Sequence, residues 1–149
     1  MPVIPSAKHR RRAALAAIGV SLVAISLVGW TQTHPAVAFH IESDDHMNQK
    51  LRQIPRHIEA HPSIPVRVIL IAGGVRAVLD GASDPNGGFF SAQLEQLLAK
   101  NVRIFACENT LRSFNKSLDD LTFGIETVPS GIAELGRLQF ELGFAYLKL

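Results

Sequence analysis

The sequence predicts an α/β domain built on a mostly parallel sheet with helices on both of its faces. Strand-like and helix-like stretches alternate from residue 36 onward, and such alternation is typical of parallel strands joined by helical crossovers. Residues 66–72 are almost continuously apolar, which indicates a central strand covered on both faces. Residues 36–149 are enough to bury one hydrophobic core, so we expect a single folded domain there.

The first predicted strand and helix occupy residues 36–61. An apolar run over 36–41 predicts the strand. Apolar residues spaced by three and four then predict a helix, at Met47, Leu51, Ile54 and Ile58. Asp44 or Asp45 is expected to cap the start of this helix, and Pro55 is expected to kink or break it.

The strand at 66–72 ends at two glycines, Gly73 and Gly74. Val75 to Leu79 predicts a short helix, and Asp80 to Gly88 predicts a loop because it is rich in glycine, aspartate, asparagine and proline. A second amphipathic helix is indicated by Phe90, Leu94, Leu97 and Leu98.

The last part of the chain predicts three further strands, at 102–107, 125–128 and 144–147. Glu108 to Arg112 begins a polar segment, and a helical turn is expected at 118–121. The final helix is indicated by Ile132, Leu135, Leu138 and Leu142, with Ser130 as its N-cap and Gly143 after its end.

The predicted functional edge of the sheet lies at the carboxyl ends of these strands, where parallel sheets place their ligands. This edge holds several short polar or glycine-containing groups, which are Ser43-Asp44-Asp45, Gly73-Gly74, Cys107-Glu108-Asn109 and Pro129-Ser130-Gly131. The chain has one cysteine, which excludes an intrachain disulfide, a C-x-x-C pair and a multi-cysteine zinc site. Cys107 is therefore either an inert buried thiol, a reactive one, or half of an intermolecular bridge.

The N-terminal 35 residues are predicted to be a signal peptide or a signal-anchor. A basic cluster at 8–12 precedes an uncharged, mainly apolar run over 13–30, which as a helix would just cross a bilayer. The positive-inside rule then places the domain on the periplasmic side of the inner membrane. An A-x-A pattern at 36–38 favours cleavage, but cleavage there would cut the first strand, so anchored and cleaved forms both remain open. A buried core helix, with a cytoplasmic protein, is the alternative.

The charge of the chain argues against a nucleic-acid binder. Four of its fifteen lysines and arginines lie in residues 8–12, and all thirteen acidic residues follow, so the rest of the chain has a net charge of −2. A nucleic-acid interface needs a basic patch on the folded domain.

Three segments resemble the DsrE/DsrF-like family, and in particular its small members with an A-C-x-N-T-L stretch. They are Phe39-His40-Ile41-Glu42-Ser43-Asp44, Phe105-Ala106-Cys107-Glu108-Asn109-Thr110-Leu111 and the block from Val128 to Gln139. The resemblance implies a three-layer α/β/α domain with a five-stranded sheet, assembled as a homo-oligomer (trimer or hexamer). Some relatives carry sulfur as a persulfide on a cysteine in intracellular sulfur relays. The leader, the glycine-rich loop at 80–90 and Thr122-Phe123-Gly124 depart from the family pattern.

The resemblance and the residues together favour a sulfur-handling role in which Cys107 carries a persulfide to a partner-protein thiol without a bound cofactor. Asn109 would cap a turn beside the sulfur, Arg112 would supply positive charge, and Glu108 would oppose thiolate formation. The predicted pocket consists of Ser43, Asp44, Gly73, Gly74, Glu108, Asn109, Thr110, Arg112 and Ser130. The alternative is a non-catalytic oligomeric module that binds a small ligand or a partner at the cell envelope.

Other site types fit the sequence less well. His40, Asp44, Asp45 and His46 have the chemistry of metal ligands but follow no known ligand spacing, so we predict no metal. Gly73-Gly74 lies between a strand and a helix but lacks the remaining residues of a phosphate-binding motif. Ser130 lacks the G-x-S-x-G setting of a nucleophile.

Overall fold

The computed structural model describes residues 35–149, and its centre is a five-stranded sheet in which every pairing is parallel. The strand order is β4-β3-β2-β1-β5. The strands are β1 (Val37–Ile41), β2 (Val66–Leu70), β3 (Arg103–Cys107), β4 (Glu126–Val128) and β5 (Ala145–Lys148). The predicted mostly parallel sheet is thus confirmed, and all five expected strands are present.

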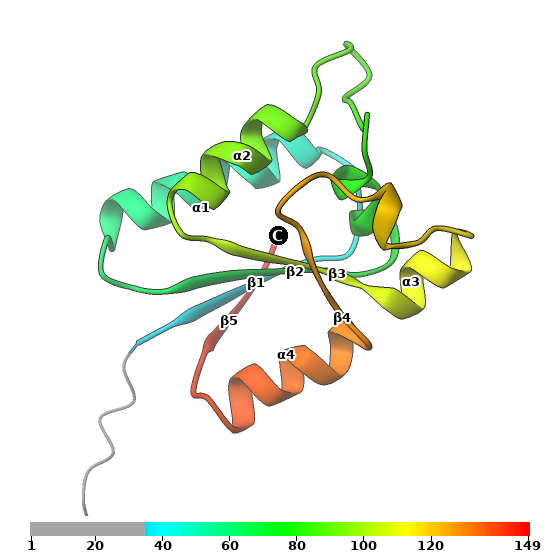
Figure 1. Cartoon of the computed structure of the whole chain (residues 1–149). Coiled ribbons are helices and arrows are strands. Elements are labelled where there is room, and N and C mark those ends of the chain that lie inside the picture. Colours follow the sequence, from blue (N-terminus) through cyan, green and yellow to red (C-terminus); the bar gives the residue numbers. More distant parts are fainter. Residues whose placement is uncertain (1–34) are drawn as a thin grey trace, which may run out of the picture. The chain divides into compact units, whose positions relative to one another are not determined.

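Helices cover both faces of the sheet and complete three layers (Figure 1). One face carries α1 (Met47–Ala60) and α2 (Ser91–Ala99), and the other carries α4 (Gly131–Phe140). Three shorter helices lie in the connections, namely the 3-10 helix η1 (Ala72–Val78), α3 (Glu108–Ser113) and the 3-10 helix η2 (Leu118–Asp120).

The two faces of the sheet are packed unequally, because one cluster of buried apolar residues is much larger than the other. Alternate residues of β1 point to opposite faces: Val37, Phe39 and Ile41 join the large core beneath α1 and α2. Ala38 joins a much smaller cluster, in which Leu135 and Leu138 of α4 pack on the sheet. The α4 layer therefore rests on a small apolar contact.

Two predicted details of α1, its cap and a break at Pro55, are wrong. Neither Asp44 nor Asp45 caps the helix; the N-cap is His46, in the left-handed conformation at φ 53° and without a side-chain cap. The reason is that both carboxylates are engaged elsewhere, because Asp45 accepts a hydrogen bond from the Ser43 hydroxyl (2.7 Å) and Asp44 faces Arg76. Pro55 lies inside the helix, which continues unbroken to Ala60.

The predicted ends of two other elements also shift. The strand predicted over 66–72 ends at Leu70, because Ala72 adopts a left-handed conformation (φ 47°) and begins η1. The final helix ends at Phe140 rather than at Leu142, and Gly143 (φ 69°) lies in the connection to β5. Ser130 is the N-cap of α4, as predicted, and its Oγ accepts a hydrogen bond from the Ala133 N–H (3.4 Å).

The predicted leader, including the apolar run over 13–30, lies outside the described residues and stays a prediction. Within residues 35–149, none of the helices has the length and apolar character needed to cross a membrane.

The close packing of Gly74 generates the first testable prediction. A Cβ at this position would lie 2.3 Å from the Ile41 carbonyl oxygen, and backbone at that distance must move. We expect Gly74→Ala to lower the free energy of unfolding by about 1–3 kcal/mol, the usual cost of overpacking a core. Urea unfolding of the full chain measures this change.

Gly136→Ala is the matched control, because a Cβ at Gly136 would meet nothing closer than 4.0 Å. Alanine also favours the helical conformation over glycine by up to about 1 kcal/mol. This variant should therefore be as stable as the parent or more so. Equal destabilisation by the two substitutions would contradict the packing argument.

Candidate functional site

A pocket of about 470 Å³ opens at the carboxyl ends of β2 and β3. It forms there because parallel strands bring their carboxyl ends, and the loops that follow, to the same edge of the sheet. Cys107 is the last residue of β3 and lies in the wall of this pocket. The lining residues are Ile71, Ala72, Gly73, Arg76, Cys107, Asn109, Thr110, Ser113, Phe114, Ser130 and Ile132.

The Cys107 thiol is held against the first residue of α4. Only 4% of Cys107 is exposed, and its Sγ accepts a hydrogen bond from the Gly131 N–H at 3.3 Å. A Cβ on Gly131 would lie 2.6 Å from Ile71 Cγ1 and 3.3 Å from Cys107 Cβ. Glycine at this position is therefore what lets the backbone of α4 approach the sulfur.

These surroundings lower the pKa of Cys107. Burial acts in the opposite direction and raises the pKa, because it disfavours the charged thiolate. The hydrogen-bond donors outweigh burial: the backbone N–H of Gly131 contributes most, followed by Thr110 and Asn109. The net pKa lies below that of an ordinary cysteine, which favours the nucleophilic thiolate.

The prediction that Asn109 caps a turn after the cysteine is wrong, because Asn109 lies inside helix α3. Helix α3 begins at once with Glu108, and Cys107 is its N-cap residue. The polar segment predicted from Glu108 is thus the first turn of a helix, and its backbone N–H groups begin beside the sulfur. A stretch as short as E-N-T-L-R-S is too brief to show a helical pattern of apolar residues.

Thr110 ties this helix to the end of β2. Its side chain is buried (8% exposed), and its Oγ1 accepts a hydrogen bond from the Ala72 N–H at 3.1 Å. The same hydroxyl helps to lower the pKa of Cys107 below that of an ordinary cysteine. The Thr110 side chain therefore has two contacts. It holds the left-handed backbone of Ala72 by a hydrogen bond, and it helps to stabilise the Cys107 thiolate.

Arg112 and Glu108 do not act on the thiol in the expected way. Arg112 donates a hydrogen bond to Asn109 Oδ1, and its guanidinium lies 3.6 Å from the Glu108 carboxylate. Glu108 also accepts a hydrogen bond from the Thr127 hydroxyl at 2.9 Å. Neither residue lines the pocket, and their opposite charges pair with each other instead.

The cation that does line the pocket is Arg76, which the sequence analysis missed. Its guanidinium lies 3.5 Å from Asp44 and 4.8 Å from the centre of the Phe114 ring. One sequence signal could have placed Arg76 in the pocket. Arg76 follows the predicted pocket residue Gly73 by three positions, and residues i and i+3 lie on the same side of a 3-10 helix. Reading Val75 to Leu79 as an ordinary helix hid that relation.

The remaining predicted pocket residues divide between the pocket and its surroundings. Gly73 and Ser130 line the pocket. Asp44 lies just outside, against Gly73 and Arg76, whereas the Ser43 hydroxyl faces Asp45. Gly74 is packed on the backbone of β1, so its role is close approach of the chain, not a phosphate cradle.

The residues weighed as metal ligands do not converge. His40 Nδ1 lies 2.8 Å from the Tyr146 hydroxyl, across β1 and β5, while Asp44 and Asp45 are engaged with Arg76 and Ser43. Between residues 35 and 149, no group of three or more histidine, cysteine, aspartate or glutamate side chains is placed to hold an ion.

The fold and pocket together define a three-layer α/β/α domain with one cysteine at the carboxyl edge of a parallel sheet. The family model described as "DsrE/DsrF-like family" matches residues 36–149. The chain belongs to this family, as the sequence motifs indicated.

Solved structures of similar fold agree with this assignment. A protein of unknown function from Methanobacterium thermoautotrophicum, MTH1491, is 28% identical with a TM-score of 0.69, over 76% of this chain and 98% of that one. The ychN protein of E. coli is 20% identical with a TM-score of 0.65, over 77% and 99% of the two chains. At that identity the second likeness concerns the fold alone. A search of curated proteins found no match.

The role of Thr110 generates the second prediction. Thr110→Val removes the hydroxyl that helps to lower the pKa of Cys107 and leaves the Ala72 N–H without its acceptor. We expect the pH at which iodoacetamide alkylation is half-maximal to rise in this variant. Mass spectrometry of the full chain across a pH series measures the change.

Ser113→Ala is its control, because Ser113 also lines the pocket but donates its hydroxyl to the Thr110 carbonyl oxygen (2.7 Å). Its alkylation profile should match that of the parent. An unchanged profile in Thr110→Val would show that the hydroxyl does not influence the thiol.

Proposed function

We propose that this protein carries sulfane sulfur as a persulfide on Cys107 and passes it to a partner-protein thiol. The observation that carries this proposal is the hydrogen bond from the Gly131 N–H to Cys107 Sγ (3.3 Å) at the wall of an open pocket. Family membership supports it only coarsely, because DsrE-like proteins do not share one established role.

The chemistry requires a thiolate and room for one more sulfur atom. The Cys107 thiolate attacks the sulfane sulfur of a donor, a new S–S bond forms, and the donor leaves with the electron pair of the bond that breaks. In the second step, a partner thiolate attacks the outer sulfur and Cys107 leaves as the thiolate. No external oxidant is needed, and no bound cofactor takes part.

The pocket residues support both steps. Donors that favour the Cys107 thiolate, from Gly131, Thr110 and Asn109, also favour Cys107 as the leaving group. The pocket volume of about 470 Å³ accommodates a persulfide and a small donor. Of the predicted residues, Asn109 and Thr110 shape the pocket directly, while Arg112 acts through its hydrogen bond to Asn109.

The test of this function is intact mass spectrometry of the full chain before and after treatment with inorganic polysulfide. We expect a gain of one sulfur atom that dithiothreitol removes and that Cys107→Ser lacks. A folded chain that gains no sulfur, and whose cysteine is alkylated only slowly, would overturn the carrier role.

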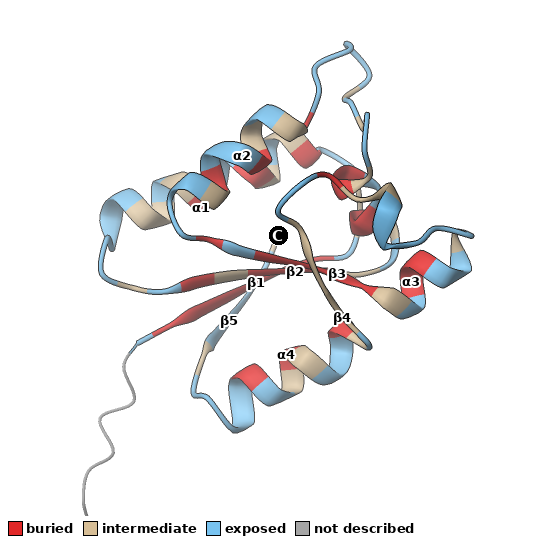
Figure 2. Cartoon of the chain, in the orientation of Figure 1, coloured by how far each residue is buried: buried red, intermediate tan, exposed pale blue. Residues whose placement is uncertain are grey.

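The second candidate is the non-catalytic oligomeric binding module, and exposed apolar side chains favour it. Ile132 (65% exposed) and Phe140 (89%) lie on α4. Tyr146 and Leu147 lie on the edge strand β5, which is exposed at every position (Figure 2). We propose that a second copy of the chain covers this surface in a trimer or hexamer, because the α4 layer buries little apolar area by itself.

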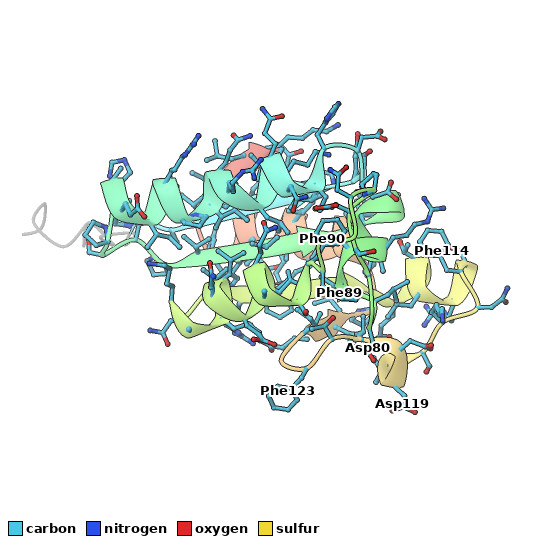
Figure 3. The ribbon with its side chains drawn as sticks, turned by 90° about the horizontal axis from the view of Figure 1, so that it is seen from above. Asp80, Phe89, Phe90, Phe114, Asp119 and Phe123 are labelled. Atoms are coloured by element: carbon cyan, nitrogen blue, oxygen red, sulfur yellow. The ribbon has the colours of Figure 1, made fainter. Side chains whose placement is uncertain are left out.

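Assembly gives a prediction of its own. Light scattering should show a trimer or hexamer of the full chain, and Phe140→Ser should weaken it by about tenfold or more, the effect of truncating a large interface side chain. Phe123→Ser is the control: this side chain is 95% exposed and points away from the domain at the loop before β4 (Figure 3). A parent chain that is monomeric in this measurement would contradict the proposed assembly.

We propose that either role is carried out on the periplasmic side of the inner membrane. The support is the sequence of residues 8–30 alone, with its basic cluster followed by an apolar run. The residues that line the pocket all lie between 71 and 132, outside the predicted leader.

A further inference from the structure

The hydrogen-bonding groups of the Cys107 pocket are mostly donors. Ser130 Oγ accepts from the Ala133 N–H, which leaves its hydroxyl proton to donate. Asn109 Oδ1 accepts from Arg112, which leaves the Asn109 amide nitrogen as the part available to a ligand. The lining includes a guanidinium, Arg76, but no aspartate or glutamate. Such a set fits a ligand that is rich in acceptors.

Arg76 has donors to spare for such a ligand. A guanidinium carries five N–H groups, and the one acceptor found for it within residues 35–149 is Asp44 Oδ2, at the long distance of 3.5 Å. The Arg76 side chain is 57% exposed and the Asp44 side chain 40%, so water screens their attraction. Stacking on Phe114, with the guanidinium 4.8 Å from the ring centre, holds the cation at the pocket wall.

The rest of the wall is apolar. Ile71, Phe114 and Ile132 line the pocket together with the polar groups, and Figure 3 shows Phe114 at the end of α3. A ligand with a polarizable, weakly hydrated part therefore has a surface to contact while its charged part meets Arg76. Divalent sulfur is such an atom, since it is soft and polarizable.

We propose that the pocket selects an anionic sulfane-sulfur donor of the thiosulfate type, with Arg76 as the residue that recognises its oxyanion. This inference rests on the proposed carrier function of Cys107 and adds the charge class of the donor to it. The oxyanion accepts hydrogen bonds from Arg76 and from the Ser130 and Asn109 donors, and the sulfane sulfur faces Cys107 Sγ.

The transfer step balances with thiosulfate as the donor. The Cys107 thiolate attacks the terminal sulfur, the Cys107 S–S bond forms, and the S–S bond of thiosulfate breaks. Sulfite leaves with that electron pair, so the products are the Cys107 persulfide anion and the sulfite dianion. Arg76 offsets the negative charge that approaches a thiolate, a contact that would otherwise be repulsive.

Binding is tested separately from reaction. Thiosulfate is titrated against the full chain carrying Cys107→Ala, which cannot form a persulfide, and the rise in its unfolding temperature reports binding. Adding Arg76→Gln should weaken this binding about tenfold or more, the size expected for a lost charge-assisted hydrogen bond. Adding Arg56→Gln is the control, because Arg56 is an exposed residue of α1 and lies outside the pocket.

Three results overturn the inference: no saturable effect of thiosulfate, equal weakening by the two arginine substitutions, or no weakening by either. Equal weakening would mean that general surface charge attracts the anion. Because the Arg76–Asp44 pair is an exposed ion pair of small energetic value, Arg76→Gln should keep the unfolding temperature of the parent in the absence of thiosulfate.

Reaction then separates this inference from the carrier function. With Cys107 present, persulfide formation from thiosulfate should slow about tenfold in Arg76→Gln and stay unchanged in Arg56→Gln. If polysulfide loads both arginine variants and thiosulfate also loads them equally, the carrier function stands and the donor inference fails. If neither donor loads the parent but thiosulfate binds through Arg76, the pocket is an anion site and the carrier function fails.

Discussion

The approach of helix α4 to the end of strand β3 is the constraint on which the candidate site depends. Gly131 brings a backbone N–H to 3.3 Å from Cys107 Sγ, and a side chain at this position would collide with Ile71 at the end of β2. Glycine at this position thus lets α4 place one of the hydrogen-bond donors to the thiol, beside those from Thr110 and Asn109. The parallel sheet makes this meeting of three chain segments unavoidable, because it sends all of their strands to one edge.

The layers of the fold were predictable because they depend on the repeat of apolar residues. The nearly continuous apolar run over 66–70 is a local signal of burial, and so are the apolar residues three and four positions apart in α1. The directions of individual polar side chains were harder to predict. Arg76 enters the pocket beside Asp44, which is 32 residues earlier in the chain, and it lies on a 3-10 helix that the apolar pattern does not reveal. Arg112 turns to its neighbours Glu108 and Asn109 because all three lie on α3, a helix too short to show an apolar repeat. Cys107 was found because a strand end is a local feature.

Family membership and site geometry answer different questions about this chain. The DsrE/DsrF-like assignment over residues 36–149 accounts for the layers, the strand order and the A-C-E-N-T-L segment. It does not choose between a sulfur carrier and a binding module, since one fold supports many chemistries. The choice rests on the electrostatics around one sulfur atom: burial raises the pKa of Cys107, and hydrogen bonds from Gly131, Thr110 and Asn109 lower it further than burial raises it.

The thin α4 layer has a consequence for the lifetime of any sulfur stored on Cys107. Leu135 and Leu138 provide most of the buried apolar contact of this helix, so α4 is held less firmly than α1, whose Met47, Leu51 and Ile54 join the large core. Elements with few buried contacts open locally at a lower free energy than the whole domain. Each such opening would remove the Gly131 donor and expose the thiol at the same moment. Protection of a bound sulfur atom against reductants is then governed by the fluctuation of a single helix, not by the global stability of the fold.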